Sequence, residues 1–376
     1  MRISMPARLS LDVSQNDTWY DSARQWSEFC AGNASRAQTA AMIAAGTYHA
    51  VMLPKAGGPE VLQCVELPLE APGPNQLRVR VRAAGVGSTD LTVLAGNYSF
   101  APKIPFVPGY EIAGTVDAIG AGVIGFQIGQ HVAALTVYGG FGEYLVREAE
   151  HFVPIPDGVS DLEAAAVILN YVTAWQMIHR VAKVHSGQTA LVTGAAGGVG
   201  TALLQLLRLA GAKTYGAASP AKHGTVQKLG ATPLDYRAAP IDRQVHAFEP
   251  QGVDYVFDAI GGANIGLCIA AARKGGTVVG YGFMAVAGKL ATAAMFFNLL
   301  VGSRLRGRRG AFYGITLLYR KNPMPLHEDL PKIFALLAEK EIDALIATTF
   351  PLLEAKQALE LLARGAVEGK IALTSS

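Results

Sequence analysis

The chain has 376 residues, of which 51% are hydrophobic and 16% are charged, and its formal net charge is +3. This length exceeds what one hydrophobic core usually organises, so we expect two domains. No uninterrupted apolar stretch reaches the roughly eighteen residues that a membrane span needs, and the small net charge argues against a nucleic-acid-binding protein. Three cysteines without a CxxC pair indicate neither a disulfide framework nor a zinc knuckle, which fits a reducing cytoplasm.

Residues 1–47 differ from the rest, because they are polar and lack a sustained strand or helix period. Asp12, Asp17 and Asp21 interrupt the pattern that a secretory leader would need. Three interpretations stay open: an unstructured leader, sequence upstream of a true start at Met42, or a short docking element formed by aromatic side chains. The aromatic residues in question are Trp19, Tyr20, Trp26 and Phe29.

From Tyr48 onward, short β-rich segments alternate with glycine and proline. Such segments predict the strands of a compact, turn-rich β domain. The predicted strands are 49–53, 77–83, 114–119 and 131–135. A helix-like stretch, 161–181, ends this part of the chain.

After this helix, strands, glycine turns and helices follow one another. The predicted strands are 189–192, 213–217, 253–258 and 276–280, and the predicted helices are 199–210 and 221–229. This alternation predicts α/β architecture with a doubly wound parallel sheet. Two amphipathic helices, 331–340 and 353–364, and a last strand, 370–374, could return the chain to the first domain.

The most informative stretch is the glycine turn 194–200, GAAGGVG, which leads directly into the predicted helix. Two glycines take the second and third positions of a dinucleotide fingerprint, and Ala195 replaces the first. Because no side chain obstructs such a turn, backbone N–H groups at the helix N-terminus can receive a pyrophosphate. We expect the dinucleotide to contact Gly194, Ala196, Gly197, Gly198, Val199 and Gly200.

The end of the second strand bears on which dinucleotide is preferred. An NAD-specific site usually has Asp or Glu there, which accepts hydrogen bonds from the ribose 2′-OH. This chain instead continues through Ser219 and Lys222 without a carboxylate. Both side chains could bind a 2′-phosphate, by hydrogen bond and by charge. The sequence therefore favours NADPH over NADH, and the alternative is that Lys222 is merely solvated.

Several longer segments appear in the order seen in zinc-independent, zeta-crystallin-like quinone oxidoreductases of the medium-chain dehydrogenase/reductase superfamily. They are AVMLPKAGGPEVLQCVELP, PFVPGYEIAGTV, GGFGEYLV, EAAAVILNYVTAWQMI, GAAGGVG and GKIAL. The resemblance implies a GroES-like, β-rich catalytic domain interrupted by a Rossmann domain that binds NADPH. The implied limits are 48–172 with 315–376 for the catalytic domain and 173–314 for the Rossmann domain, after an extension over 1–47.

The resemblance also bears on metal binding. Where zinc alcohol dehydrogenases of this superfamily have a Cys and a His, this chain has Gly87 and Tyr110, and the third ligand position falls near Leu169. Catalytic zinc normally needs three N, S or O ligands, which Glu111 alone does not provide. We therefore expect no metal, and we expect Asp90 and Glu111 to be structural.

Individual residues carry over by the same resemblance. Tyr98 resembles the tyrosine that borders the substrate cleft, where it could deliver a proton or polarise a carbonyl; a packed loop aromatic is the alternative. Thr173 resembles a threonine beside the nicotinamide, and Tyr236 resembles a tyrosine beside the 2′-phosphate. The loops at the strand ends that face the cofactor contain Gly261, Gly262, Gly280, Gly282 and Phe283.

The leading hypothesis is NADPH-dependent hydride transfer to a quinone or an α,β-unsaturated carbonyl. One alternative is an enoyl-thioester reductase, whose bulky carrier would lie in a basic groove built from the arginines within 304–309. The alternative from another class is a crystallin-like protein that binds NADPH without turnover. The family commonly pairs its Rossmann domains through edge strands, so we expect a cytoplasmic homodimer with a small-molecule substrate and without nucleic-acid or membrane partners.

Overall fold

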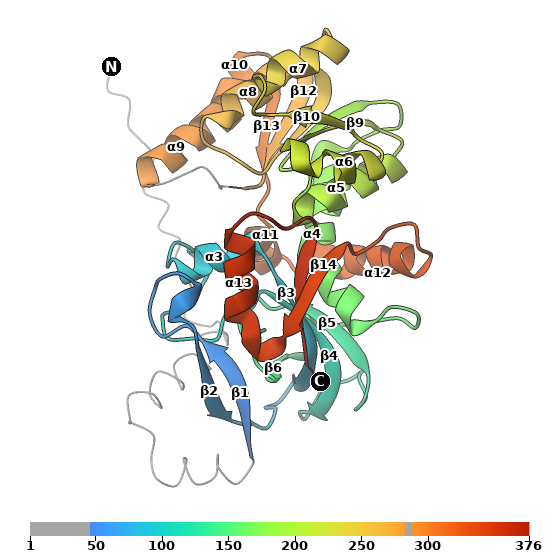
Figure 1. The fold of residues 1–376 in the computed structure, drawn as a ribbon. Helices are drawn as coiled ribbons and strands as arrows, with labels where there is room; N and C mark the ends of the chain where they lie inside the picture. Colours follow the sequence, from blue (N-terminus) through green and yellow to red (C-terminus); the bar gives the residue numbers. More distant parts are fainter. Residues whose placement is uncertain (1–45, 283–287, 376) are drawn as a thin grey trace, which may run out of the picture.

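The computed structural model describes residues 46–282 and 288–375 (Figure 1). The predicted extension, apart from Gly46 and Thr47, lies outside the described residues, and so does Phe283. Among the helices of the described part, none is long and apolar enough to span a bilayer. The described residues form two lobes, each built around its own sheet (Figure 1).

The lower lobe in Figure 1 contains a seven-stranded sheet in the order β14-β15-β3-β4-β5-β7, with β6 also paired to β3. Its strands are β3 (Gln76–Val86), β4 (Glu111–Ile119), β5 (His131–Leu135), β6 (Tyr144–Glu148), β7 (Val153–Pro154), β14 (Ile346–Pro351) and β15 (Lys370–Thr374). A two-stranded antiparallel ribbon, β1 (Thr47–Met52) and β2 (Gln63–Pro68), lies beside it. The strands predicted in this part of the chain are confirmed.

Strand β3 shows why this sheet forms. Leu77, Val79 and Val81 are buried, whereas the arginines between them face outward, which is the period of two that a half-buried strand requires. The C-terminal strand β15 pairs antiparallel with β3, with Ile371 opposite Val86. The last strand of the chain therefore returns to the sheet that β3 began, while the exact domain limits stay a prediction.

The upper lobe contains a six-stranded parallel sheet in the order β10-β9-β8-β11-β12-β13. Its strands are β8 (Thr189–Thr193), β9 (Lys213–Ala218), β10 (Thr232–Asp235), β11 (Val253–Asp258), β12 (Ala272–Gly280) and β13 (Arg309–Phe312). The helices of this lobe are α5 (Gly198–Leu209), α6 (His223–Lys228), α7 (Ile241–Phe248), α8 (Asn264–Ala271), α9 (Lys289–Phe297) and α10 (Ser303–Leu305). The predicted fold class is confirmed.

Alternate residues of these strands enter different hydrophobic clusters on the two faces of the sheet. Ala190 and Val192 pack into one cluster, and Leu191 between them packs into the other. Helices therefore cover both faces (Figure 1). The strand order reverses direction between β8 and β11, and the carboxyl ends at such a switch point form the crevice where open α/β sheets bind ligands.

Four helices complete the lower lobe and the junction, together with α4 (Asp161–Gln176) and the π-helical turn Met177–Ala182. These four helices are α3 (Ser88–Leu94), α11 (Ile315–Lys321), α12 (Met324–Ala338) and α13 (Ala355–Ala363). Helix α12 begins seven residues before the predicted start at Pro331. Leu326, Leu330 and Phe334 are buried at intervals of four residues, so the buried face of the helix continues past the proline. Pro331 itself lies on the exposed side.

Candidate active site at the junction of the two lobes

The glycine turn lies at the carboxyl end of β8 and opens helix α5. Gly194 has a φ of +64°, and a Cβ on Gly200 would lie 2.2 Å from the carbonyl oxygen of Gly194, so the turn leaves no room for a side chain there. Helix α5 begins at Gly198, and Thr201 N donates the first bond of its ladder, to Gly197 O (2.8 Å). The N–H groups before Thr201 precede this ladder, as in a helix terminus that receives an anion.

Asp258 lies at the carboxyl end of β11, the strand next to β8. Its buried carboxylate accepts hydrogen bonds from Thr193 Oγ1 (2.6 Å), Gly261 N (2.8 Å) and Asn264 Nδ2 (2.6 Å). These bonds tie the end of β8 to the loop that follows β11. Gly282 packs against the same loop, since a Cβ there would lie 2.1 Å from Ala259 O. The structure thus brings the predicted residues Gly194, Gly261 and Gly282 to one edge of the sheet.

Lys222 lies between the two lobes. Its ammonium donates hydrogen bonds to the carbonyl oxygens of Gly365 (2.9 Å) and Val367 (2.8 Å), in the loop between α13 and β15. The same loop meets the glycine turn, because Gly369 N donates to Ala196 O (3.1 Å). Ser219 is half-buried at the end of β9, and Tyr236, which follows β10, is 53% exposed.

Thr173 lies on α4 and is buried in the junction. One turn further along, Gln176 accepts a hydrogen bond from Tyr313 Oη (2.9 Å) and donates one to Asp329 (3.0 Å). Arg180 contacts the same carboxylate with Nε (2.6 Å) and Nη2 (2.7 Å). This network joins α4 to the segment after β13 and to α12.

The hydroxyl of Tyr98 lies in a cluster of three hydroxyl groups. It is hydrogen-bonded to the hydroxyl of Tyr110 and, at 2.7 Å, to Thr316 Oγ1. Burial raises the pKa of Tyr98, and the hydrogen bonds to Thr316 and Tyr110 oppose that rise. Burial also raises the pKa of Tyr110 well above its ordinary value. A neutral phenol with two hydroxyl partners can hold or transfer a proton at this place.

Gly87, Leu169 and Lys370 come together beside this cluster. A Cβ on Gly87 would be 3.8 Å from Leu169 Cδ2 and 3.8 Å from Lys370 Nζ. Lys370 forms a buried ion pair with Glu111, whose other carboxylate oxygen accepts a hydrogen bond from Leu169 N (2.5 Å). Both oxygens of Glu111 are thereby engaged. In the described part of the chain, no three His, Cys, Asp or Glu side chains are grouped so that they could hold a metal ion.

Asp90 is buried next to Gly87, whose N–H donates to its Oδ2 (2.9 Å). Burial raises the pKa of this carboxyl to about 7, although the Gly87 N–H and the Lys370 charge work against the rise.

Three residues of the site were not predicted from the sequence: Lys370, Thr316 and Asn170. Asn170 packs on the start of α5, since a Cβ on Gly198 would meet its Nδ2 at 2.5 Å. The sequence did contain a sign of the role of Lys370, because a lysine stands at the start of the otherwise apolar strand 370–374.

Two other features lie away from this crevice. Arg306 and Arg308 bond to backbone oxygens of Gly302 and Ala272, at the amino ends of the parallel strands. The arginines within 304–309 therefore lie at the edge of the sheet opposite to the glycine turn.

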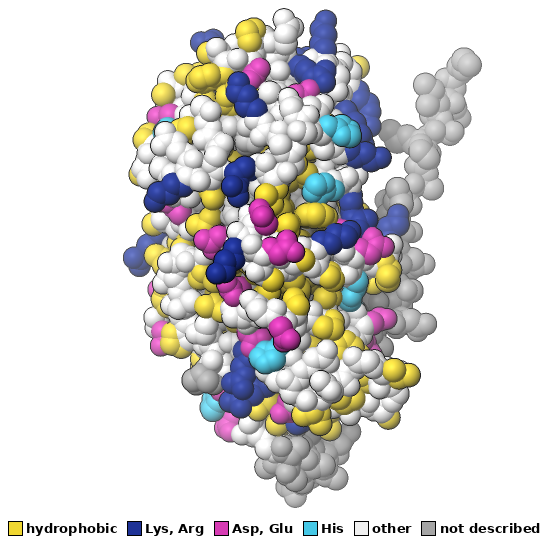
Figure 2. Space-filling view, turned by 90° about the vertical axis from the view of Figure 1, so that its right-hand side faces the viewer, with side chains coloured by type: hydrophobic (Ala, Val, Ile, Leu, Met, Phe, Trp, Pro, Cys, Tyr) yellow, Lys and Arg dark blue, Asp and Glu magenta, His cyan; other side chains and the backbone are white. Residues whose placement is uncertain are grey.

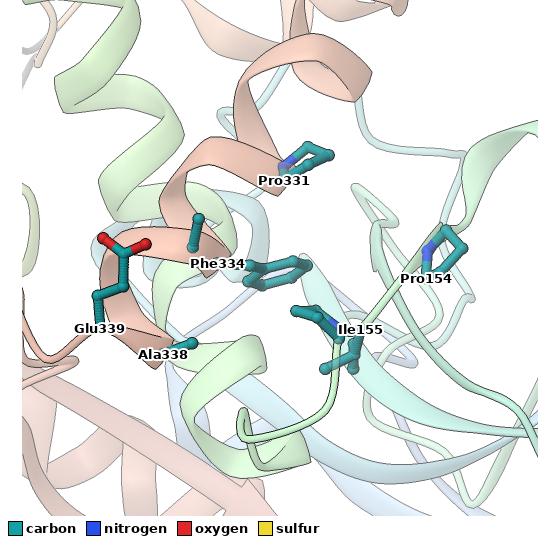
Figure 3. Close-up of a pocket in the computed structure, with 8 residues that line it drawn as sticks. Pro154, Ile155, Pro331, Phe334, Ala338 and Glu339 are labelled. Carbon is teal, nitrogen blue, oxygen red and sulfur yellow. The ribbon is translucent and has the colours of Figure 1, made fainter.

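An apolar hollow of about 430 Å³ lies between α12 and the segment after β7, where Phe334 and Ile155 point toward each other (Figure 3). None of the predicted site residues lines it.

The surface charges are mixed. Figure 2 shows the face that lies on the right of Figure 1, and basic and acidic side chains are interspersed over its middle. Such mixing gives no field of one sign on this face.

Comparisons with known proteins agree with this architecture. Residues 73–157 match the alcohol dehydrogenase GroES-like domain, and residues 229–373 match a zinc-binding dehydrogenase family. The human synaptic vesicle membrane protein VAT-1 homolog-like is 37% identical over 235 residues, which is 62% of this chain and 56% of that protein. The match thus spans little more than half of that relative's length.

Solved structures extend the likeness over most of the chain. A probable oxidoreductase from Mycobacterium abscessus is 30% identical with a TM-score of 0.73, and the alignment covers 88% of this chain and 99% of that one. The quinone oxidoreductase from Coxiella burnetii is 26% identical with a TM-score of 0.76, over 88% of this chain and 100% of that one. The chain therefore belongs to the quinone oxidoreductase branch of the medium-chain dehydrogenase/reductase superfamily, whose members are NAD(P)-binding oxidoreductases.

Proposed function

We propose that this protein is an NADPH-dependent reductase that transfers a hydride to a quinone or an α,β-unsaturated carbonyl without zinc. The observation that carries the proposal is the bond between Tyr98 and Tyr110. Tyr110 stands where zinc-dependent relatives have a metal ligand, and here it supports a phenol instead. A proton donor thus takes the place of a Lewis acid at the junction of the two lobes.

The glycine turn supports a dinucleotide at this junction. The N–H groups at the start of α5 would receive the pyrophosphate, next to the backbone of Ala196 and Val199. Gly261 and Gly282 would face the cofactor from the neighbouring strand ends, and Thr173 would approach its nicotinamide. The open backbone at Gly197, where a Cβ would meet only Gly194 O, at 3.3 Å, is consistent with this use.

The preference for NADPH rests on the residues after β9. Ser219, Lys222 and Tyr236 would surround the 2′-phosphate. The two carbonyl partners of Lys222 leave one of its three ammonium donors for a phosphate oxygen. Because β9 ends in Ala218 without a carboxylate, nothing in that turn repels the phosphate.

The proposed mechanism assigns positioning and one proton to the protein. The bound nicotinamide supplies the hydride. Asp258 holds the loops that position the cofactor, and the Tyr98 hydroxyl gives a proton to the reduced substrate or polarises its carbonyl. The half-buried position of Tyr98 limits access of water to that proton.

Independence from zinc is part of the proposal. Gly87 and Leu169 have no donor atom in their side chains, and the Glu111 carboxylate is engaged by Lys370 and Leu169 N. The buried ammonium of Lys370 adds a positive charge next to Gly87. A second cation would have to overcome that charge.

We also propose that the protein acts as a cytoplasmic homodimer. Among the described strands, β13 is the outermost of the parallel sheet on its side, and its outer edge would pair with a second copy. Phe297, Val301 and Leu305 are exposed on the helical segment that precedes it. Burial of these side chains would add apolar area to the same interface.

Turnover tests the proposal. Oxidation of NADPH is followed while the pure protein is offered a quinone, an enone and an enoyl thioester, with NADH in parallel. Reduction of the quinone or the enone with NADPH is expected. Preference for the enoyl thioester would favour that alternative, although the arginines within 304–309 lie on the opposite side of the sheet. Binding of NADPH without reduction of any acceptor would favour the crystallin-like alternative.

A further inference from the structure

The three hydroxyl groups around Tyr98 come from three separate segments. Tyr98 follows α3, Tyr110 precedes β4, and Thr316 lies in the first turn of α11. Tyr110 and Thr316 are 1% and 2% exposed, so neither hydroxyl has bulk water to bond instead. A hydroxyl oxygen accepts two hydrogen bonds and donates one. If Tyr110 and Thr316 both donate to Tyr98, its oxygen is saturated and its own proton is free for a third partner.

The charges around Tyr98 favour this assignment. Burial raises the pKa of Tyr98 most, the hydrogen bonds to Thr316 and Tyr110 and the charge of Arg320 lower it, and the Asp90 carboxylate raises it. Burial and the contact with Tyr98 raise the pKa of Tyr110. These directions favour an arrangement in which Tyr110 keeps its proton and donates the hydrogen bond to the Tyr98 oxygen.

Helix α11 presents Arg320 on the same face as Thr316, because the two residues are four positions apart. Arg320 Nη2 donates to Phe100 O (3.0 Å), and its guanidinium lies 5.3 Å from the centre of the Phe100 ring. That ring packs edge-on against Tyr98, with centroids 5.6 Å apart. One helix thus supplies both a hydroxyl and a positive charge to the Tyr98 phenol.

Helix α11 follows closely on the carboxyl end of β13. Thr316 comes four residues after Phe312, which ends β13, and the carboxyl ends of parallel strands border the ligand site. Tyr313 N donates to Gly280 O (2.9 Å), two residues before Gly282. Thr316 is therefore held close to the strand ends that flank the predicted cofactor site.

We propose that Tyr110, Thr316 and Arg320 are positioning residues that direct the Tyr98 O–H toward the substrate and stabilise the phenolate left after proton transfer. This inference rests on the proposed function. In the step, the hydride forms a C–H bond at the electrophilic carbon, and the electron pair of the C=C bond moves to the enolate. The enolate takes the proton as the Tyr98 O–H bond breaks, and water later returns a proton to the phenolate. Tyr110 and Thr316 donate to the phenolate oxygen throughout and lose no proton.

A titration tests this inference without turnover. In the full-length protein, Tyr98 is replaced by 3,5-difluorotyrosine, whose fluorines lower the phenol pKa into the range where the protein stays folded. The ¹⁹F NMR signal then reports the ionisation of this one residue. The midpoint should rise by about one pH unit in Tyr110→Phe and in Thr316→Val, because each variant removes a donor to the phenolate. Arg320→Met should raise it in the same direction.

Two matched variants sharpen the titration. Thr316→Ser keeps the hydroxyl and should keep the wild-type midpoint. Tyr144→Phe removes a phenol hydroxyl on β6, outside the cluster, and should leave the midpoint unchanged. Equal midpoints in the wild type, Tyr110→Phe and Thr316→Val would overturn the inference.

Turnover supplies the second readout. With an enone acceptor, Tyr110→Phe and Thr316→Val should lower kcat about tenfold and increase the solvent deuterium isotope effect, with KM for NADPH unchanged. Full kcat in Tyr98→Phe would overturn the proton-donor role even if the titration shifts. If no acceptor is reduced by the wild type, the proposed function fails, while the titration still decides whether Tyr110 and Thr316 support the Tyr98 phenolate.

Discussion

The ammonium of Lys222 donates a 2.8 Å hydrogen bond to the carbonyl oxygen of Val367, which lies 145 residues further along the chain. This bond joins the start of α6, in the parallel-sheet lobe, to the loop that precedes β15, in the other lobe. The same side chain is the proposed partner of the 2′-phosphate. Lys222 therefore takes part both in the contact between the lobes and in the proposed preference for NADPH.

Replacing Lys222 by alanine should weaken NADPH binding much more than NADH binding. The loss of one charge-assisted contact to the 2′-phosphate corresponds to about 1–3 kcal/mol for NADPH, while NADH has no phosphate there. Isothermal titration of both nucleotides measures the difference, with Lys228→Ala at the exposed end of α6 as the control. Equal losses for the two nucleotides would indicate that Lys222 acts only through Gly365 and Val367.

The purified protein should contain far less than one zinc ion per chain. The Gly87 and Leu169 side chains have no ligand atoms, and both Glu111 oxygens are engaged. Elemental analysis by mass spectrometry measures the metal, and treatment with a strong chelator should leave turnover unchanged. Stoichiometric zinc that is lost together with activity would contradict this expectation.

The substitution Lys370→Met should destabilise the fold strongly. Lys370 and Glu111 are 2% and 0% exposed, so removing the ammonium leaves a buried carboxylate without its counter-charge. The expected loss is about 3–5 kcal/mol in the free energy of unfolding, measured by urea titration. The double variant Lys370→Met/Glu111→Gln removes both charges and keeps an acceptor for Leu169 N, so it should recover part of the loss. A single variant as stable as the wild type would show that the pair contributes little.

His151 should make stability depend on pH in the acid range. Burial, and then the nearby charges of Arg147 and His327, lower the pKa of His151 from 6.5 to about 4. Because the unfolded chain binds this proton first, the contribution is fully present above pH 6.5 and is lost as pH falls toward 4. A shift of this size corresponds to about 3 kcal/mol.

Urea unfolding of the wild type and His151→Gln between pH 4 and pH 7.5 isolates this contribution. The stability difference between the two proteins should shrink as the pH falls. The exposed His185→Gln variant serves as the control for a histidine replacement at the surface. A constant difference for His151→Gln would indicate that its ring titrates normally in the folded protein.

The local pattern of the sequence predicted several of the elements. The glycine turn, the strand 253–258 and the helix 161–181 were recognised because each is one continuous segment whose residue types indicate its structure. Helix α11 was not predicted, since residues 315–321 show no amphipathic repeat. The predicted start of α12 was too late, because a proline commonly marks the first turn of a helix. Propensity alone does not show that an apolar stripe continues across Pro331.

The candidate site was predictable only in part, for a similar reason. Residues on one turn, such as Gly197 and Gly200, are close in sequence and therefore predictable. Thr316, a partner of Tyr98, and Lys370, the partner of Glu111, lie 218 and 259 residues away in the chain, and only the tertiary structure brings these pairs together. The link from Lys222 to Gly365 is likewise a product of tertiary structure.

The most direct test of the central claim is the fate of the hydride. NADPH carrying deuterium at one C4 position at a time is offered with an enone in ordinary water, and the product is analysed by NMR. We expect deuterium from one of the two forms on the β-carbon of the product and a proton from the solvent on the α-carbon. A product without deuterium from either form, or NADPH that stays unoxidised with the enone and also with a quinone, would contradict the proposed hydride transfer.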